Sequence, residues 1–111
     1  MYNTVYTMDK NKETRIEEFE WDRFNAEKIQ KKHNVGTYEC EEIFLNEYLK
    51  ILPDETHSIT EFRYYAYGNT DAGRLLFIVF TIRINKIRVI FARDMNRKER
   101  KWYYEEIKKD T

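Results

Sequence analysis

The sequence is poor in the residues that disulfide-rich, collagen-like and low-complexity proteins depend on. Its 111 residues include one cysteine, one proline and three glycines. The single cysteine, Cys40, cannot form an intrachain disulfide, so the fold does not depend on an oxidising compartment. The few glycines and prolines favour one compact domain with short loops.

The sequence also lacks a segment typical of a membrane span or a leader. No run approaches the roughly 20 apolar residues that a span needs, and the N-terminus has no basic region followed by an apolar stretch. Metal and phosphate motifs are missing as well, because Cys40, His33 and His57 have no ligand spacing and no glycine-rich phosphate loop occurs. We therefore predict a cytoplasmic protein that uses no metal and no cofactor.

What the chain does have is aromatic rings and charge. Aromatic residues make up 16% and charged residues 36% of the sequence, with a formal net charge of zero. Acidic residues dominate residues 38–62, whereas basic residues dominate residues 83–101. A molecule polarised in this way can bind a polyanion on one side and a basic partner on the other. Two solvated helices of different charge explain the same pattern.

The apolar pattern predicts an α+β domain in the order strand, helix, helix, three antiparallel strands, helix. The expected strands are residues 15–21, 60–67, 74–84 and 87–92. The first helix is expected to begin after Asp22 as its N-cap and to run to about His33. The second begins near residue 36 and ends before Pro53, with Cys40, Ile43, Phe44 and Tyr48 on its apolar face.

The third helix is expected at residues 94–109, with Trp102, Tyr103 and Ile107 as its anchors in the core. Residues 54–58 and 68–73 are expected to form loops, and Asn85 with Lys86 the connection between the last two strands. Residues 1–15 are polar and without a clear period, which predicts a mobile or loosely packed arm. Residues 16–111 then form a single domain.

Two arginines stand out in the predicted hairpin. If Asn85 and Lys86 form a two-residue loop, Arg83 lies directly opposite Arg88 on one face of the sheet. Opposed like charges destabilise a sheet unless both side chains extend into water. The alternative is a phosphate clamp, because two guanidinium forks match the oxygens of a phosphodiester. Arg93 would add a third fork, although strict alternation places it on the other face unless the strand ends or bulges first.

Residues able to transfer a proton are few. His33 follows two lysines at the end of the first helix, where it is either a general acid or base or simply a favourable charge on the helix dipole. His57, in a polar loop, is a weaker candidate. Glu61 and Arg63 share one face of a strand and form either a surface ion pair or a base with its orienting partner.

A series of segments occurs in the order found in a known family. They are FEWD (19–22), KHNV (32–35), EIF (42–44), Glu61-Phe62-Arg63, Gly68, GRLLFIVFTIR (73–83), IRVIFAR (87–93) and RKERKWYYE (97–105). Over about residues 17–106 the chain resembles the BrnT family, the toxins of BrnT/BrnA type II toxin–antitoxin systems.

The resemblance implies a RelE-like ribonuclease fold, with a small antiparallel sheet of about four strands, two N-terminal helices and one C-terminal helix. It also implies a ribonuclease toxin that arrests translation without a metal, by driving the ribose 2′-OH onto the adjacent phosphate. The implied partner is a BrnA-like antitoxin with a ribbon-helix-helix part, through which alone operator DNA is contacted.

The resemblance also assigns residues. It places Arg83, Arg88 and Arg93 on the arginines of the family's last two strands, His33 on its histidine and Glu61 on the acidic residue of its E-x-R strand. We expect Arg83 and Arg88 to bind phosphate and His33 or Glu61 to move the proton. The expected further RNA contacts are Lys32, Lys86, Arg97 and Tyr103.

The sequence departs from the family pattern at Asn34, Gly36 and Asp94, where glycine, serine and a basic residue are usual. Together with the zero net charge, Asp94 lowers the expected affinity for RNA, since phosphate neutralisation supplies most nonspecific binding. The alternative is a non-catalytic RelE-like module that binds an antitoxin or nucleic acid. A catalyst needs its arginines together on an open site beside a titratable group, whereas a binder tolerates them apart.

Overall fold

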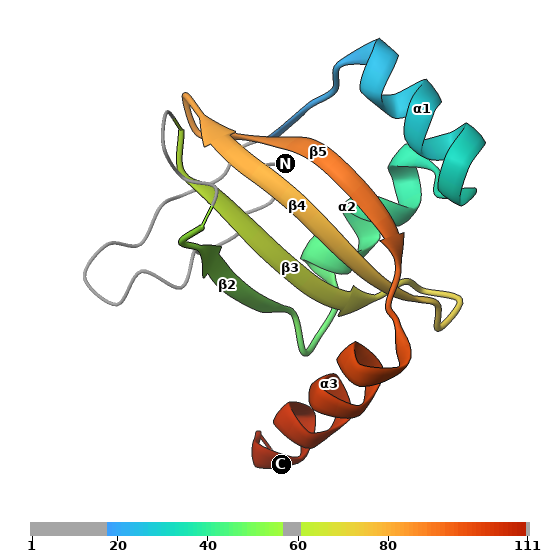
Figure 1. Ribbon diagram of the computed structural model, residues 1–111, viewed down its shortest axis with the longest axis vertical. Helices are drawn as coiled ribbons and strands as arrows, with labels where there is room; N and C mark the ends of the chain where they lie inside the picture. Colours follow the sequence, from blue (N-terminus) through green and yellow to red (C-terminus); the bar gives the residue numbers. More distant parts are fainter. Residues whose placement is uncertain (1–17, 57–60, 111) are drawn as a thin grey trace.

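The computed structural model describes residues 18–56 and 61–110, so the predicted arm and His57 lie outside the described residues. The described chain forms an α+β domain, as predicted (Figure 1). Its elements are β1 (Glu18–Glu20), α1 (Arg23–His33), α2 (Thr37–Leu45), β2 (Lys50–Asp54), β3 (Arg63–Asn69), β4 (Leu75–Arg83), β5 (Lys86–Asp94) and α3 (Arg97–Lys109).

The strands form one sheet of five strands in the order β1-β5-β4-β3-β2. All neighbours are antiparallel except β1 and β5, which are parallel. The expected number of about four strands was too low, because β2 was predicted as the end of a helix and a loop. The second helix ends at Leu45, and Tyr48 has a φ of 67°, which no helix tolerates. Pro53 fits a strand here because β2 lies at the sheet edge.

The two faces of the sheet are covered unequally. α1 and α2 pack on one face and enclose the main core, which includes Ile29, Cys40, Ile43, Phe44 and Phe80. α2 can approach closely because β3 has Gly68 beneath it, where a Cβ would lie 3.0 Å from the Cβ of Ile43. α3 covers only one end of the other face (Figure 1). No described helix covers the rest of that face, which we call the open face.

α3 is anchored as the sequence predicts. Tyr103 is fully buried in a smaller core with Tyr67 and Phe77, and Trp102 and Ile107 pack against it. The Trp102 ring lies edge-on to Tyr67, with centroids 4.8 Å apart. These contacts fix α3 at the end of the sheet where β5 finishes.

The hairpin between β4 and β5 has a different register from the predicted one. Ile84 and Asn85 form its loop, with φ of 49° and 60°, as a type I′ turn requires. Arg83 therefore pairs with Lys86, and Arg88 pairs with Thr81. The expected loop at Asn85 and Lys86 and the direct opposition of Arg83 and Arg88 were both wrong. A β-branched residue such as Ile84 rarely adopts a positive φ, so residue preferences had favoured Asn85 and Lys86 as the loop.

β5 contains a bulge that changes which side chains share a face. Val79 pairs with Phe91 and Phe80 pairs with Val89, so Ile90 is an extra residue. Because side chains alternate along a strand, one extra residue reverses the alternation after it. Arg93 thus lies opposite Phe77 and on the same face as Arg88.

Candidate active site

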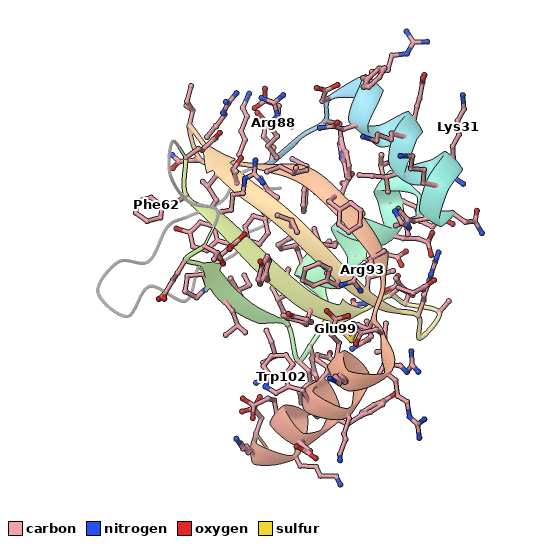
Figure 2. The ribbon with its side chains drawn as sticks, viewed as in Figure 1. Lys31, Phe62, Arg88, Arg93, Glu99 and Trp102 are labelled. Atoms are coloured by element: carbon pink, nitrogen blue, oxygen red, sulfur yellow. The ribbon has the colours of Figure 1, made fainter. Side chains whose placement is uncertain are left out.

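The open face carries all three arginines singled out in the sequence. Their spacing can be read from the pairing with β4. Arg88 pairs with Thr81, which is two residues from Arg83 on β4. Arg93 pairs with Phe77, which is four residues beyond Thr81. At about 3.3 Å per residue, the row spans roughly 20 Å. Figure 2 shows Arg88 and Arg93 near opposite ends of β5. The arginines therefore form a row along the sheet and do not converge on a single point.

At the hairpin end of the row, Arg83 binds Glu61 in a two-pronged contact. Its Nε and one terminal nitrogen donate to the two carboxylate oxygens at 2.7 and 3.2 Å. The hydrogen bond from Arg83 lowers the pKa of Glu61 below its usual value. Lys86 is held next to this pair by Glu18, at 2.9 Å. The predicted proton carrier Glu61 and the phosphate-binding candidate Arg83 are thus in direct contact.

Arg88 is held less tightly than Arg83. A single contact of 3.3 Å joins it to one oxygen of Asp22, whose other oxygen caps α1 by accepting from the backbone N–H groups of Phe24 and Asn25. Thr81 lies opposite Arg88 and is buried, and its hydroxyl has no hydrogen bond of ordinary geometry with a described residue. The Arg88 guanidinium therefore keeps several donors that no described side chain uses.

At the α3 end, Arg93 binds Glu99 with two hydrogen bonds, of 2.7 and 3.1 Å. Its guanidinium also lies 4.4 Å from the ring centroid of Phe77, a cation–π contact. Burial would raise the pKa of Glu99, but the hydrogen bonds from Arg93 and the Asn96 backbone outweigh it and leave that pKa lowered. In Figure 2 the Arg93 and Glu99 side chains lie together where β5 gives way to α3.

His33 belongs to the α3 end of the open face. Its ring is edge-on to Phe91, with centroids 5.0 Å apart, at the C-terminus of α1. Phe91 pairs with Val79, which is four residues from Arg83 on β4, or about 13 Å. The predicted catalytic residues therefore fall into two groups, Glu61 with Arg83 and Arg88, and His33 with Arg93.

Arg74 is the residue that the sequence analysis missed. Its guanidinium donates to both carboxylate oxygens of Asp94, at 2.6 and 3.1 Å, and to those of Glu39, at 3.2 Å. It also donates to the backbone carbonyls of His33 and Asn34, at 3.1 and 2.7 Å. Arg74 thus joins α1, α2 and the end of β5, and it fixes the backbone from which the His33 ring projects. The pKa of Asp94 is lowered, chiefly by the hydrogen bond from Arg74.

The predicted RNA contacts differ in accessibility. Lys32 and Arg97 are exposed, on α1 and at the start of α3, and Lys86 is half-buried beside Glu18. Tyr103 is fully buried, donates to the carbonyl of Tyr48 and accepts from the amide of Asn69. It has no free ring face for a base, so its assignment as an RNA contact was wrong. Its position among the anchors of α3 already indicated a core role.

Other chemistry finds little support in the described part of the chain. Residues 18–56 and 61–110 contain no group of three histidine, cysteine or acidic side chains that could hold a metal. Burial raises the pKa of Cys40 to about 12, so this thiol is a core residue and not a nucleophile. None of the described helices is long and apolar enough to span a membrane.

Comparisons with known proteins identify the family. The family model described as "Ribonuclease toxin, BrnT, of type II toxin-antitoxin system" matches residues 21–99. The ribonuclease toxin BrnT of Brucella abortus has a similar structure, with a TM-score of 0.58 and 20% sequence identity over 72% of this chain and 97% of that one. A search of curated proteins found no match. The fold is thus that of BrnT, and the chain belongs to the BrnT family of ribonuclease toxins of type II toxin–antitoxin systems.

Proposed function

We propose that the protein is a metal-independent endoribonuclease toxin that cleaves RNA on the open face and thereby inhibits translation. The observation that carries the proposal is the row of Arg83, Arg88 and Arg93 on the sheet face that the described helices leave largely open, with Glu61 in contact with Arg83. Guanidinium groups bind phosphate oxygens through paired N–H donors. A row of them follows an RNA backbone better than it surrounds one small anion.

The reaction is a transfer of the phosphate from the next nucleotide to the ribose 2′ oxygen. Glu61 takes the proton from the 2′-OH, which then attacks the adjacent phosphorus as the bond to the 5′ oxygen breaks. The leaving 5′ oxygen takes a proton from water as its bond to phosphorus breaks, so the products are a 2′,3′-cyclic phosphate and a free 5′-OH, and Glu61 returns its proton to solvent. Arg83 and Arg88 stabilise the additional negative charge on the phosphate. The Glu61 carboxylate is ionised at neutral pH and can accept a proton, and the hydrogen bond from Arg83, which lowers its pKa, makes it a weaker base than a free carboxylate.

The second group of residues lies too far from Glu61 to share the same phosphate. We assign Arg93, His33, Lys32 and Arg97 to the RNA strand beyond the cleavage point, at the α3 end of the open face. Of the two proton carriers suggested by the sequence, Glu61 is thereby preferred, because it touches a phosphate-binding candidate. His33 instead contacts Phe91, whose partner Val79 lies about 13 Å along β4 from Arg83.

A toxin of a type II system has an antitoxin as its partner. We propose that this partner is a BrnA-like protein with a ribbon-helix-helix part, that it covers the open face, and that operator DNA is contacted only through it. An antitoxin seated there would exclude RNA from the arginine row. Inhibition then needs no change in the fold of the toxin.

A second candidate function is a binding module without catalysis. It is favoured by the pairing of all three arginines with carboxylates, which reduces the positive potential that RNA would meet. The two functions differ at Glu61. A catalyst loses cleavage but keeps RNA binding when Glu61 loses its charge, whereas a pure binder never cleaves.

The deciding experiment incubates the purified chain with a defined RNA in the presence of EDTA. The parent is compared with Glu61→Gln, with Arg83→Ala/Arg88→Ala, and with Lys98→Gln/Lys101→Gln, which removes two charges from exposed positions on α3. We expect fragments with 2′,3′-cyclic phosphate ends from the parent and the α3 control, and none from the other two. Equal cleavage by all four proteins would refute the proposed site, and no cleavage by any of them, with or without ribosomes, would favour the binding module.

A further inference from the structure

The exposed surface of α1 carries lysines that no described residue binds. Lys28, Lys31 and Lys32 are exposed, and none forms an ion pair or a side-chain hydrogen bond with a described residue. The one carboxylate of the helix, Glu27, is bound by Arg23 at 3.2 Å. In Figure 2, Lys31 points away from the sheet. The lysines thus present positive charge that described carboxylates do not neutralise.

Two exposed aromatic rings flank these lysines. Phe24 is 75% exposed at the start of α1, and Tyr38 is 66% exposed at the start of α2. The Tyr38 ring lies against Gly36, where a Cβ would be only 2.8 Å from it. Single exposed apolar residues are common. Here two exposed rings lie beside three lysines that bind no described residue, so the surface combines aromatic and cationic groups.

The rings and lysines line two neighbouring hollows. One hollow, of about 210 Å³, is lined by Phe24, Glu27, Lys28, Lys31 and Lys32. The other, of about 400 Å³, lies between α1 and the start of α2 and has Lys31 and Tyr38 in its wall. Lys31 and Glu27 belong to both, so the two hollows adjoin. We call Phe24, Lys28, Lys31, Lys32 and Tyr38 the α1 surface.

The α1 surface continues to the open face through His33. A third hollow, of about 60 Å³, lies between α1 and β5. Its lining includes Lys28, Lys32, His33 and Phe91. Two lysines of the α1 surface therefore also border the histidine and the aromatic ring at the α3 end of the arginine row. The lining of this hollow contains no carboxylate, so a flexible polyanion can follow it from one surface to the other.

We propose that the α1 surface is a second binding surface for single-stranded RNA, which holds the strand beyond the cleavage point. This inference rests on the proposed ribonuclease function. Lysine ammonium groups neutralise phosphates, and exposed aromatic rings stack on unpaired bases of any sequence. Alternating rings and cations suit a single strand, whose bases and phosphates both reach the protein.

The test measures binding of a fluorescent oligoadenosine of about 12 nucleotides, uniformly 2′-O-methylated so that it cannot be cleaved, by anisotropy at several salt concentrations. Lys28→Gln/Lys31→Gln should reduce the slope of log K against log salt by about 1.4, because each phosphate contact with a single strand contributes about 0.7. Phe24→Leu/Tyr38→Leu keeps apolar side chains but removes the rings. It should weaken binding about tenfold and leave the salt slope unchanged.

The matched control is Lys98→Gln/Lys101→Gln on α3, which removes the same two charges from exposed helical positions outside the α1 surface. An equal loss in this control would overturn the proposal, because total charge alone would then explain the effect. Unchanged RNA binding by both α1 variants would also overturn it, and a simultaneous loss of antitoxin binding would assign the surface to that partner. If the parent itself binds no RNA, the proposed function fails first.

Discussion

The cations of the open face and those of the α1 surface are arranged in opposite ways. Arg83, Arg88 and Arg93 are each bound by a carboxylate from outside their own strand, whereas the α1 lysines bind no described carboxylate. A carboxylate partner fixes the direction of a guanidinium but cancels its positive charge. An unpaired lysine keeps its charge, but its side chain has no fixed direction. The number of basic residues alone therefore does not show which surface orients a polyanion and which one attracts it.

The effect of pairing a cation with carboxylates should be largest at Arg74, which forms more hydrogen bonds than any other cation of the described chain. Arg74→Ala removes one guanidinium donor from each of Asp94, Glu39 and two backbone carbonyls, so the free energy of unfolding should fall by about 2 to 3 kcal/mol. Urea denaturation measures the loss. Arg74→Lys should recover only part of it, since an ammonium cannot form both forks. Unfolding of the alanine variant at the parent's midpoint would show that pairing here does not stabilise the fold.

A smaller effect is expected at the pair of Arg93 and Glu99. A double-mutant cycle with Arg93→Ala and Glu99→Gln should give a coupling of about 1 to 2 kcal/mol, because two charge-assisted hydrogen bonds join partly buried groups. The single contact of 3.3 Å between Arg88 and Asp22 provides the comparison and should couple more weakly. If the two cycles give equal values, geometry does not set the strength of pairing on this face.

The smallest effect concerns acid. The pKa values of Glu61 and Asp94 are lowered in the folded chain, in each case chiefly by a hydrogen bond from an arginine. Unfolded carboxyls therefore bind protons at a higher pH than folded ones, so stability is present above the ordinary values near 4 and is lost as the pH falls below them. Solvent screens both pairs, so each contribution should be the smallest of the three effects.

Thermal unfolding between pH 6 and pH 3 measures this acid loss. Asp94→Asn should show a shallower decline than the parent, because one of the carboxyls with a lowered pKa is gone. Lys28→Gln/Lys31→Gln should follow the parent's curve, since the α1 lysines bind no described carboxylate. A different acid dependence in the lysine variant would erase the distinction between the two surfaces.

Much of the fold follows from local signals in the sequence. Asp22 caps α1 and Asn34 ends it in a left-handed conformation, as their residue types predict. The long apolar run formed β4, and Trp102, Tyr103 and Ile107 anchor α3. Each of these features depends on residues close together in the chain, which is why sequence reasoning reached them.

The features that escaped prediction depend on distant contacts. β2 is an edge strand whose proline is tolerated only because its outer side has no neighbour in the sheet. Ile84 adopts a backbone conformation that its own preference opposes, since the register of the main core decides the turn. The carboxylates that bind Arg74, Arg83 and Arg93 lie 6 to 35 residues away in the chain, so no spacing rule finds them.

The family resemblance correctly named the protein class, but it did not determine the geometry of the site. It selected Arg83, Arg88, Arg93, His33 and Glu61 as one catalytic set, which the structure divides between the two ends of β5. The separate expectation of an RNA contact at Tyr103 gave that residue a surface role that its burial excludes. Residue type alone does not separate a tyrosine that faces solvent from one that anchors a helix.

The extra residue in β5 has a consequence for how this domain tolerates insertions and deletions. Loss of Ile90 would make Val89 and Phe91 neighbours, and because they already lie on opposite faces, paired with Phe80 and Val79, every later residue of the strand would keep its face. One residue inserted after Phe91 would instead turn over the rest of the strand, so that Arg93 would point toward the core beneath α1 and Ala92 would face outward. A point substitution on the open face removes one side chain, whereas such an insertion exchanges the inside and the outside of the strand end.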